Sequence, residues 1–170
     1  MDLKAFAKGE SIGAIQSFFS NGAEKPLIGA IEGFALAGGL EIALSCDLLV
    51  AAAGARLGIP EVKVGLFAAG GGVIRLPSRV GYGKAMEMAI TGDPISAEEG
   101  HAYGLITQVV EPGSAVEAAT ALAERVAKNA PLGVAASKQM IRATLGATEE
   151  ELWKAQGALY GPVFTSNDAK

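Results

Sequence analysis

Two glutamates, Glu41 and Glu61, occupy surroundings in which a negative charge is costly. Glu41 is the one carboxylate in the apolar stretch GFALAGGLEIALSC, which begins at Gly33, and Glu61 follows Pro60 ahead of a glycine-rich segment. Their separation, 61 − 41 = 20 residues, accommodates one strand and two turns, so the chain can return and bring the carboxylates together. Two adjacent carboxylates in a poorly solvated pocket can supply one base and one acid. Taken singly, Glu41 also fits a helix-dipole partner and Glu61 an exposed loop charge.

The Gly38-Gly39 pair lies directly before Leu40-Glu41, where a helix is expected to begin. Glycines let the backbone approach a ligand closely, and the first amides of a helix have no partner within it. The helix dipole adds positive potential at the same end. An oxygen that gains negative charge during a reaction would be stabilised there. The alternative is a plain packing turn.

Hydrophobic periodicity and turn residues predict the elements that position these groups. Strand and helix patterns alternate in the first half of the chain, which indicates an α/β fold, and the last third has helical spacing throughout. Capping boxes at Ser96 with Glu99 and at Thr148 with Glu151 mark two helix starts. The expected strands are Leu27–Ile31, Asp47–Ala53 and Ile106–Val110. The expected helices are Ser11–Ser20, Leu40–Cys46, Tyr82–Thr91, Ser114–Asn129, Leu132–Leu145 and Thr148–Phe164. We expect a turn at Gly33–Gly39 and a loop around Glu61.

Several other reactive or aromatic side chains have simpler structural interpretations. His101 lacks a nearby nucleophile, and Lys138 lies on an expected solvated helix face. Trp153 and Tyr160 are seven positions apart on one helix, which favours core packing or a subunit contact. The lone Cys46 has apolar neighbours, so we expect a buried reduced thiol. One His and one Cys cannot form the usual zinc sites, and no metal is expected.

The composition excludes several classes of partner. The formal net charge of −4 gives no general support for nucleic-acid binding, and no basic block indicates a membrane surface. The longest uncharged stretches, Ser11–Ala23 and Ala155–Asn167, are shorter than the about 18 residues that a spanning helix needs. The segment MDLKAFAKGE has no apolar stretch flanked by basic residues, so no secretory signal is expected, and a single reduced cysteine is typical of a cytoplasmic protein. We therefore expect a cytoplasmic protein that binds neither nucleic acid nor membrane.

The segments KPLIGAIEGFALAGGLEIALSCDLLVAA, ARLGIPEVKVGLFAAGGGVIRLPSRVG and AMEMAITGDPISAEEGHAYGLITQVV, within about residues 25–110, resemble the enoyl-CoA hydratase/isomerase, or crotonase, family. The resemblance implies a spiral of ββα units followed by helices, assembled as trimers or hexamers. It places a partial crotonase-like core at residues 1–112 and an incomplete helical region at 113–170. Since family members continue beyond both ends of this pattern, we expect the sequence to be part of a longer chain.

The resemblance also implies a chemistry. Glu41 and Glu61 match the glutamate pair that adds water across the 2,3 double bond of an enoyl-CoA thioester, as in fatty-acid β-oxidation. Gly38 and Met1 match the two amides of the oxyanion hole that binds the thioester oxygen. The implied substrate is an acyl-CoA, and no cofactor is needed because CoA is part of the substrate. The residues expected to bind this substrate are Asp2, Leu3, Lys4, Ala37, Gly38, Pro60, Glu61 and Ala69.

Two alternatives stay open at this point. Family isomerases often keep only the second carboxylate, so the presence of both favours a hydratase over an isomerase or another crotonase-type lyase. The other alternative is a non-catalytic fragment that binds a CoA thioester or serves in oligomerisation.

Overall fold

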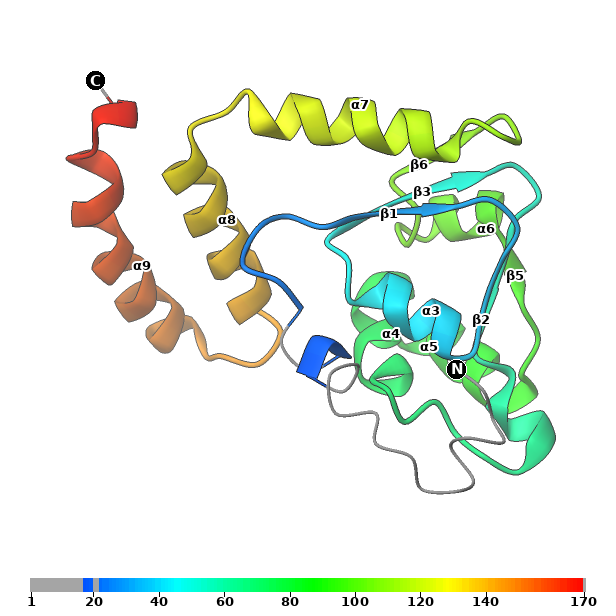
Figure 1. Cartoon of the computed structure of the whole chain (residues 1–170). Helices are drawn as coiled ribbons and strands as arrows, with labels where there is room; N and C mark the ends of the chain where they lie inside the picture. Colours follow the sequence, from blue (N-terminus) through cyan, green and yellow to red (C-terminus); the bar gives the residue numbers. More distant parts are fainter. Residues whose placement is uncertain (1–16, 20–21, 170) are drawn as a thin grey trace. The chain divides into compact units, whose positions relative to one another are not determined.

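The computed structural model describes residues 17–19 and 22–169, which belong to two compact units (Figure 1). The first unit contains Leu27–Ala119 together with the described part of Met1–Ala23, and the second contains Glu24–Pro26 and the described part of Thr120–Lys170. This division falls inside α7 (Ala115–Ala127), whereas the sequence pattern placed the domain boundary after residue 112. The domain boundary at 112 stays a prediction.

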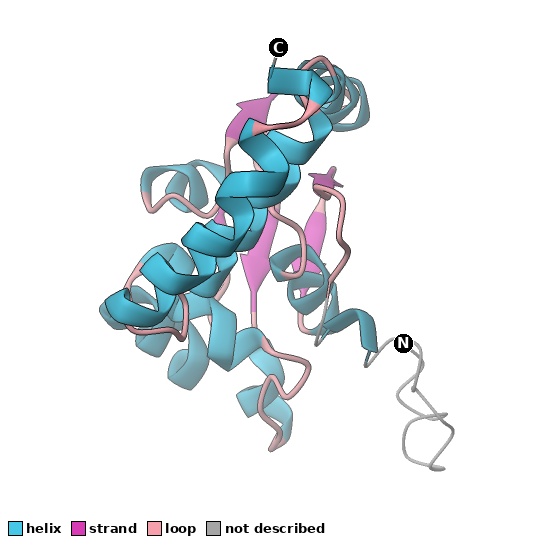
Figure 2. Ribbon diagram, turned by 90° about the vertical axis from the view of Figure 1, so that its left-hand side faces the viewer, coloured by secondary structure: helices cyan, strands magenta, loops and turns pink. Residues whose placement is uncertain are grey.

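Among the described residues, two three-stranded sheets form the framework of the first unit. One sheet has the order β1 (Ile28–Ile31), β3 (Leu48–Ala52) and β6 (Gln108–Val110), all parallel. The other has the order β2 (Phe34–Leu36), β4 (Arg56–Gly58) and β5 (Ile95–Ser96), with β2 and β4 parallel and β5 antiparallel to β4. The consecutive strands β1 and β2 lie in different sheets, and so do β3 and β4. Parallel neighbours need a crossover connection, and helices provide it (Figure 2).

The helices of the first unit follow the strands in chain order. After β2 comes α3 (Gly38–Leu44), and after β4 come the 3₁₀ turn η1 (Pro60–Val64), α4 (Gly72–Val80) and α5 (Tyr82–Thr91). After β5 comes α6 (Ala97–Ala102), which leads into β6. The order strand, strand, helix thus recurs along this part of the chain.

The core of the first unit joins the sheets to these helices. Leu40 of α3 and Leu76 of α4 are both fully buried, so α3 and α4 are fixed on the same apolar interior. The other large side chains with almost no exposed surface are Leu49, Leu57, Ile59, Met88, Leu105 and Ile106. Burying such side chains contributes about 1.5–3 kcal/mol each.

The second unit consists of helices whose side chains stay accessible. It contains α8 (Pro131–Ala143), α9 (Glu149–Phe164) and the short turn η2 (Asn167–Ala169), and no described residue of these elements is buried. Trp153 and Tyr160 are 65% and 62% exposed, so core packing does not explain them within this chain. Lys138 Nζ donates to the carbonyl of Lys25 at 2.7 Å.

Several expectations about the elements are confirmed and others are wrong. Both capping boxes are present, and His101 Nδ1 lies 2.8 Å from the carbonyl oxygen of Ile106, a structural role. The expected turn at Gly33–Gly39 is wrong, because Phe34–Leu36 pairs in register with β4 and α3 already begins at Gly38. The expected helix Ser11–Ser20 lies almost entirely outside the described residues.

Candidate active site

A strained turn presents Glu41 from the start of α3. Ala37, directly before the helix, has φ 51° and ψ −129°, and it is the only non-glycine residue with positive φ among the described residues. Its N–H donates to the Gly58 carbonyl at 2.9 Å, which ties the turn to the end of β4. Its own carbonyl accepts from the N–H groups of Leu40 at 2.9 Å and Glu41 at 3.1 Å. Such a backbone costs of order 1–3 kcal/mol and persists only where the surroundings enforce it.

The carboxylate of Glu41 is buried against the loop that precedes α4. Glu41 is 6% exposed, and the N–H of Gly72 donates to its Oε1 at 3.0 Å. A Cβ atom at Gly70 would lie 2.6 Å from Glu41 Oε2, so the bare glycine backbone lies directly against the carboxylate. A Cβ atom at Gly72 would lie 2.7 Å from the Cβ of Ala68. These glycines bring main chain, and one amide donor, to the charged group.

Glu61 lies near Glu41, but its environment differs from that of Glu41. It stands in the first turn of η1, where Pro60 occupies an N-terminal position of the turn. Its Oε2 is buried and accepts no hydrogen bond from any described residue. Burial raises the pKa of Glu61, its own backbone N–H opposes the shift, and the charge of Glu41 raises it further. The structure thus brings together the two carboxylates that the sequence analysis paired, one with an amide donor and one with an unpartnered oxygen.

The remaining predicted site residues divide between the described and undescribed parts of the chain. Gly38 is the first residue of α3, so its N–H has no partner within the helix. Ala69 is exposed, between buried Ala68 and half-buried Gly70. The predicted residues Met1, Asp2, Leu3 and Lys4 lie outside the described residues.

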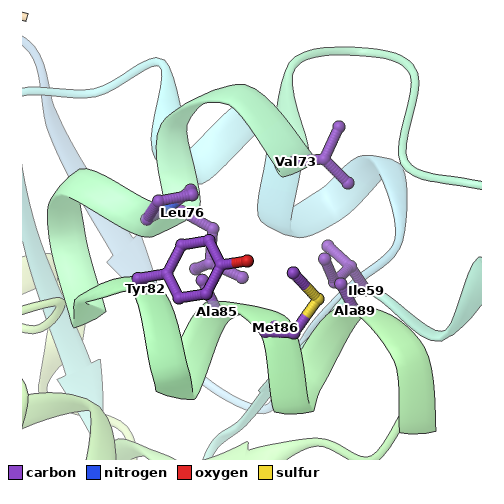
Figure 3. A pocket seen from close by; sticks show the side chains of 8 residues that line it. Ile59, Val73, Leu76, Tyr82, Ala85, Met86 and Ala89 are labelled. Carbon is purple, nitrogen blue, oxygen red and sulfur yellow. The ribbon is translucent and has the colours of Figure 1, made fainter.

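An apolar cavity that the sequence analysis did not identify lies between α4 and α5 (Figure 3). Its volume is about 170 Å³. Ile59 lines this cavity, and its side chain would also lie 3.2 Å from a Cβ at Gly72, the residue whose amide binds Glu41. The α5 residues that line the cavity follow helical spacing along one face of the helix, and this spacing is a sequence signal for that face. The lining residues are Ile59, Val73, Leu76, Pro77, Tyr82, Ala85, Met86 and Ala89.

The described part of the chain lacks two further classes of feature. It contains no group of three or more His, Cys, Asp or Glu side chains placed to hold a metal ion. It also contains no helix that is long and apolar enough to span a membrane.

Comparison with known proteins places these residues in a family. A family model described as enoyl-CoA hydratase/isomerase matches residues 17–170. The chain belongs to the enoyl-CoA hydratase/isomerase family. The resemblance seen over about residues 25–110 is confirmed, and the match extends through the C-terminal helices.

Curated members of this family include two similar enzymes. The (E)-benzylidenesuccinyl-CoA hydratase of Thauera aromatica is 49% identical over 115 residues, which cover 68% of this chain and 45% of that protein. The short-chain-enoyl-CoA hydratase of Clostridium acetobutylicum is 39% identical over 147 residues, which cover 86% of this chain and 56% of that protein. The chain therefore matches about half of the length of each of these relatives.

Solved structures confirm the crotonase-type α/β fold. The crystal structure of an enoyl-CoA hydratase from Mycobacterium tuberculosis H37Rv matches with a TM-score of 0.94 and 50% identity. The match covers 99% of this chain and 68% of that chain. The two sheets and the helices between their strands are thus the arrangement that the sequence resemblance implied.

Proposed function

We propose that the protein adds water across the 2,3 double bond of an enoyl-CoA thioester, as a hydro-lyase of the fatty-acid β-oxidation type. The observation that carries the proposal is the juxtaposition of Glu41, which accepts the Gly72 N–H, with Glu61, whose Oε2 is buried without a partner. Membership of the family and the hydratase names of two relatives support the same reaction.

The unlike environments of the two carboxylates favour a division of their roles. An N–H donor at a helix start stabilises negative charge, which suits Glu41 as the base that takes a proton from water. Burial raises the pKa of Glu61 and favours its protonated form, which suits it as the acid. The water oxygen bonds to C3 and loses a proton to Glu41. The C2=C3 π electrons shift to C1–C2, which gives an enolate with its charge on the thioester oxygen. As that charge returns and re-forms the carbonyl, C2 takes a proton from Glu61.

An oxyanion site at Gly38 complements the glutamate pair. Attack at C3 places enolate charge on the thioester oxygen, and an amide aimed at that oxygen offsets the charge. Gly38 lies directly after the strained Ala37 turn, which fixes the direction of the first α3 amides. The family resemblance assigns the main-chain nitrogen of Met1 as the second donor of this proposed hole.

The remaining parts of the proposal concern the substrate and the assembly. Ala37, Pro60 and Ala69 are proposed to line the acyl thioester site, and Asp2, Leu3 and Lys4 the part that holds CoA; no further cofactor is required. We propose a cytoplasmic homotrimer or hexamer. The large exposed side chains on α8 and α9 support an assembly, since contacts between subunits would cover them; examples are Ile141, Trp153, Tyr160 and Phe164.

Glu41→Gln and Glu61→Gln test the proposed reaction. With 2-butenoyl-CoA as the substrate, we expect each variant to lose about 10²–10⁴-fold in kcat while thioester binding persists. Glu124→Gln, which changes an exposed side chain of α7, is the matched control and should keep the parent rate. Hydration is followed by loss of the absorbance of the conjugated thioester.

Three outcomes would separate the alternatives. Full turnover in both glutamine variants would refute the assigned roles. Conversion of a 3-enoyl thioester in preference to the 2-enoyl isomer would indicate an isomerase. Tight thioester binding without hydration at high enzyme concentration would indicate a non-catalytic binding module.

A further inference from the structure

Arg79 binds the end of the helix that carries Glu41. Arg79 stands in the last turn of α4, and its Nη1 donates to the main-chain carbonyl of Asp47 at 3.2 Å. Its Nη2 donates to the carbonyl of Cys46. These carbonyls follow the C-terminal end of α3, whose cap is Ser45. Both carbonyls belong to the chain that directly follows the Ser45 cap, where the α3 dipole adds negative potential, so a guanidinium is favoured there.

The other end of α4 also contacts α3. The N–H of Gly72, the first residue of α4, donates to Glu41 Oε1 at 3.0 Å. The two helices lie side by side (Figure 1), and fully buried Leu76 of α4 packs in the interior that also holds Leu40. The two helices are therefore joined by hydrogen bonds at two well-separated points, with apolar packing between them.

Because α3 is short, the hydrogen bonds made by Arg79 matter for its orientation. A helix of seven residues is not stable alone, so its orientation depends on its neighbours. A rotation of α3 within its packing would move the Glu41 carboxylate away from the Gly72 amide. Misplacing a catalytic group by about 1 Å can cost about 10²-fold in rate.

We propose that Arg79 is a positioning residue for Glu41: it anchors the C-terminal end of α3 so that the carboxylate stays on the Gly72 amide. The catalytic part of this inference rests on the proposed role of Glu41 as the base, while the geometric part does not. Arginine suits the task because its planar fork reaches two carbonyls at once, whereas lysine is a single point of charge.

Arg79→Met and Arg79→Lys, compared with Arg125→Met, test the proposal on the full chain. Methionine keeps an apolar stem and removes the guanidinium, while Arg125 is an exposed arginine on α7. The primary measurement is the Gly72 amide in ¹H–¹⁵N NMR. We expect about tenfold faster hydrogen exchange and an upfield proton shift in Arg79→Met, a smaller change in Arg79→Lys, and none in Arg125→Met.

A kinetic measurement adds the functional arm. Arg79→Met should lower kcat about tenfold or more with KM within about twofold, and Arg79→Lys should recover part of the loss. An unchanged Gly72 amide in folded Arg79→Met would overturn the proposal. If that variant does not fold, the same measurement on Arg79→Lys decides, and a Gly72 amide like the parent's overturns it. Should Glu41→Gln retain full turnover, the catalytic role of Glu41 fails while the amide measurement still tests the anchoring.

Discussion

The N–H of Gly72 donates to Oε1 of Glu41 across 3.0 Å and so joins α4 to a residue 31 positions earlier in the chain. Among the described residues, Glu41 is the only charged residue that is buried. A buried charge without partners is strongly unfavourable, so this hydrogen bond supports the fold as well as the chemistry proposed for the site.

Gly72→Ala should destabilise the protein through overpacking. The added Cβ would lie 2.7 Å from the Cβ of Ala68 and 3.2 Å from Glu41 Oε1. We expect a loss of about 1–3 kcal/mol in the free energy of unfolding, measured by urea titration. Ala68→Gly in the same chain removes the closest contact, so the double variant should be more stable than the sum of the single effects predicts. Strict additivity of the two changes would contradict this contact.

Ala37→Gly should stabilise the fold. Glycine accepts φ 51° and ψ −129° without the cost that alanine incurs there. Relief of the strain exceeds the added freedom of the unfolded chain, and we expect a gain of about 1 kcal/mol. Ala43→Gly, inside α3, is the matched control and should lose at least about 1 kcal/mol. A loss of stability in Ala37→Gly would argue against a strained turn.

Glu61→Gln should change how stability depends on pH. Burial raises the pKa of Glu61 in the folded protein above its ordinary value of 4.5. The stability that the protonated group contributes is therefore fully present below about pH 4.5 and is lost as the pH rises through the folded value. Relative to the parent, Glu61→Gln should be more stable at about pH 7.5 than at about pH 4, as measured by urea midpoints.

The control for this prediction is Glu124→Gln on the exposed surface of α7. It should show the same difference from the parent at both pH values. An equal effect of Glu61→Gln at both pH values would mean that Glu61 titrates as it does in the unfolded chain.

Glu32→Ala should weaken the connection between the end of β1 and the start of α7. The Glu32 carboxylate accepts from the N–H groups of Gly113 and Ala115, both at 2.8 Å. Its removal leaves the amide of Ala115, a buried residue, without this acceptor, and we expect a loss of about 1–3 kcal/mol. Glu124→Ala removes an exposed carboxylate from α7 and should change the urea midpoint little; equal effects of the two changes would contradict the prediction.

Local sequence rules predicted the elements that depend on local interactions. The capping boxes at Ser96 and Thr148 follow from side-chain spacing alone, and both are present. The three strands of the all-parallel sheet, β1, β3 and β6, were predicted from their short apolar runs. Phe34–Leu36 was assigned to a turn because its pairing with β4 is a long-range interaction that a run of three residues does not reveal. The helix α4 was not predicted either, because Pro77 and the glycines before it are typical of loops.

The candidate site was only partly accessible to such reasoning. The pairing of Glu41 with Glu61 followed from their apolar neighbours and from a spacing that allows a return of the chain. The Gly72 donor and the Arg79 anchor could not be predicted, since both act through main-chain atoms that any residue supplies. The positive φ of Ala37 was equally hidden, because alanine gives no sign of it.

The absence of buried side chains from α8 and α9 bears on how the chain withstands thermal fluctuation. With only partial apolar burial, little offsets the conformational entropy that these helices lose on folding. Their amide hydrogens should therefore exchange through local opening that costs less than global unfolding, and the 144–148 connection should be cut readily by proteases. If subunits cover these helices as proposed, their protection rises with protein concentration, and dilution alone exposes them to cleavage.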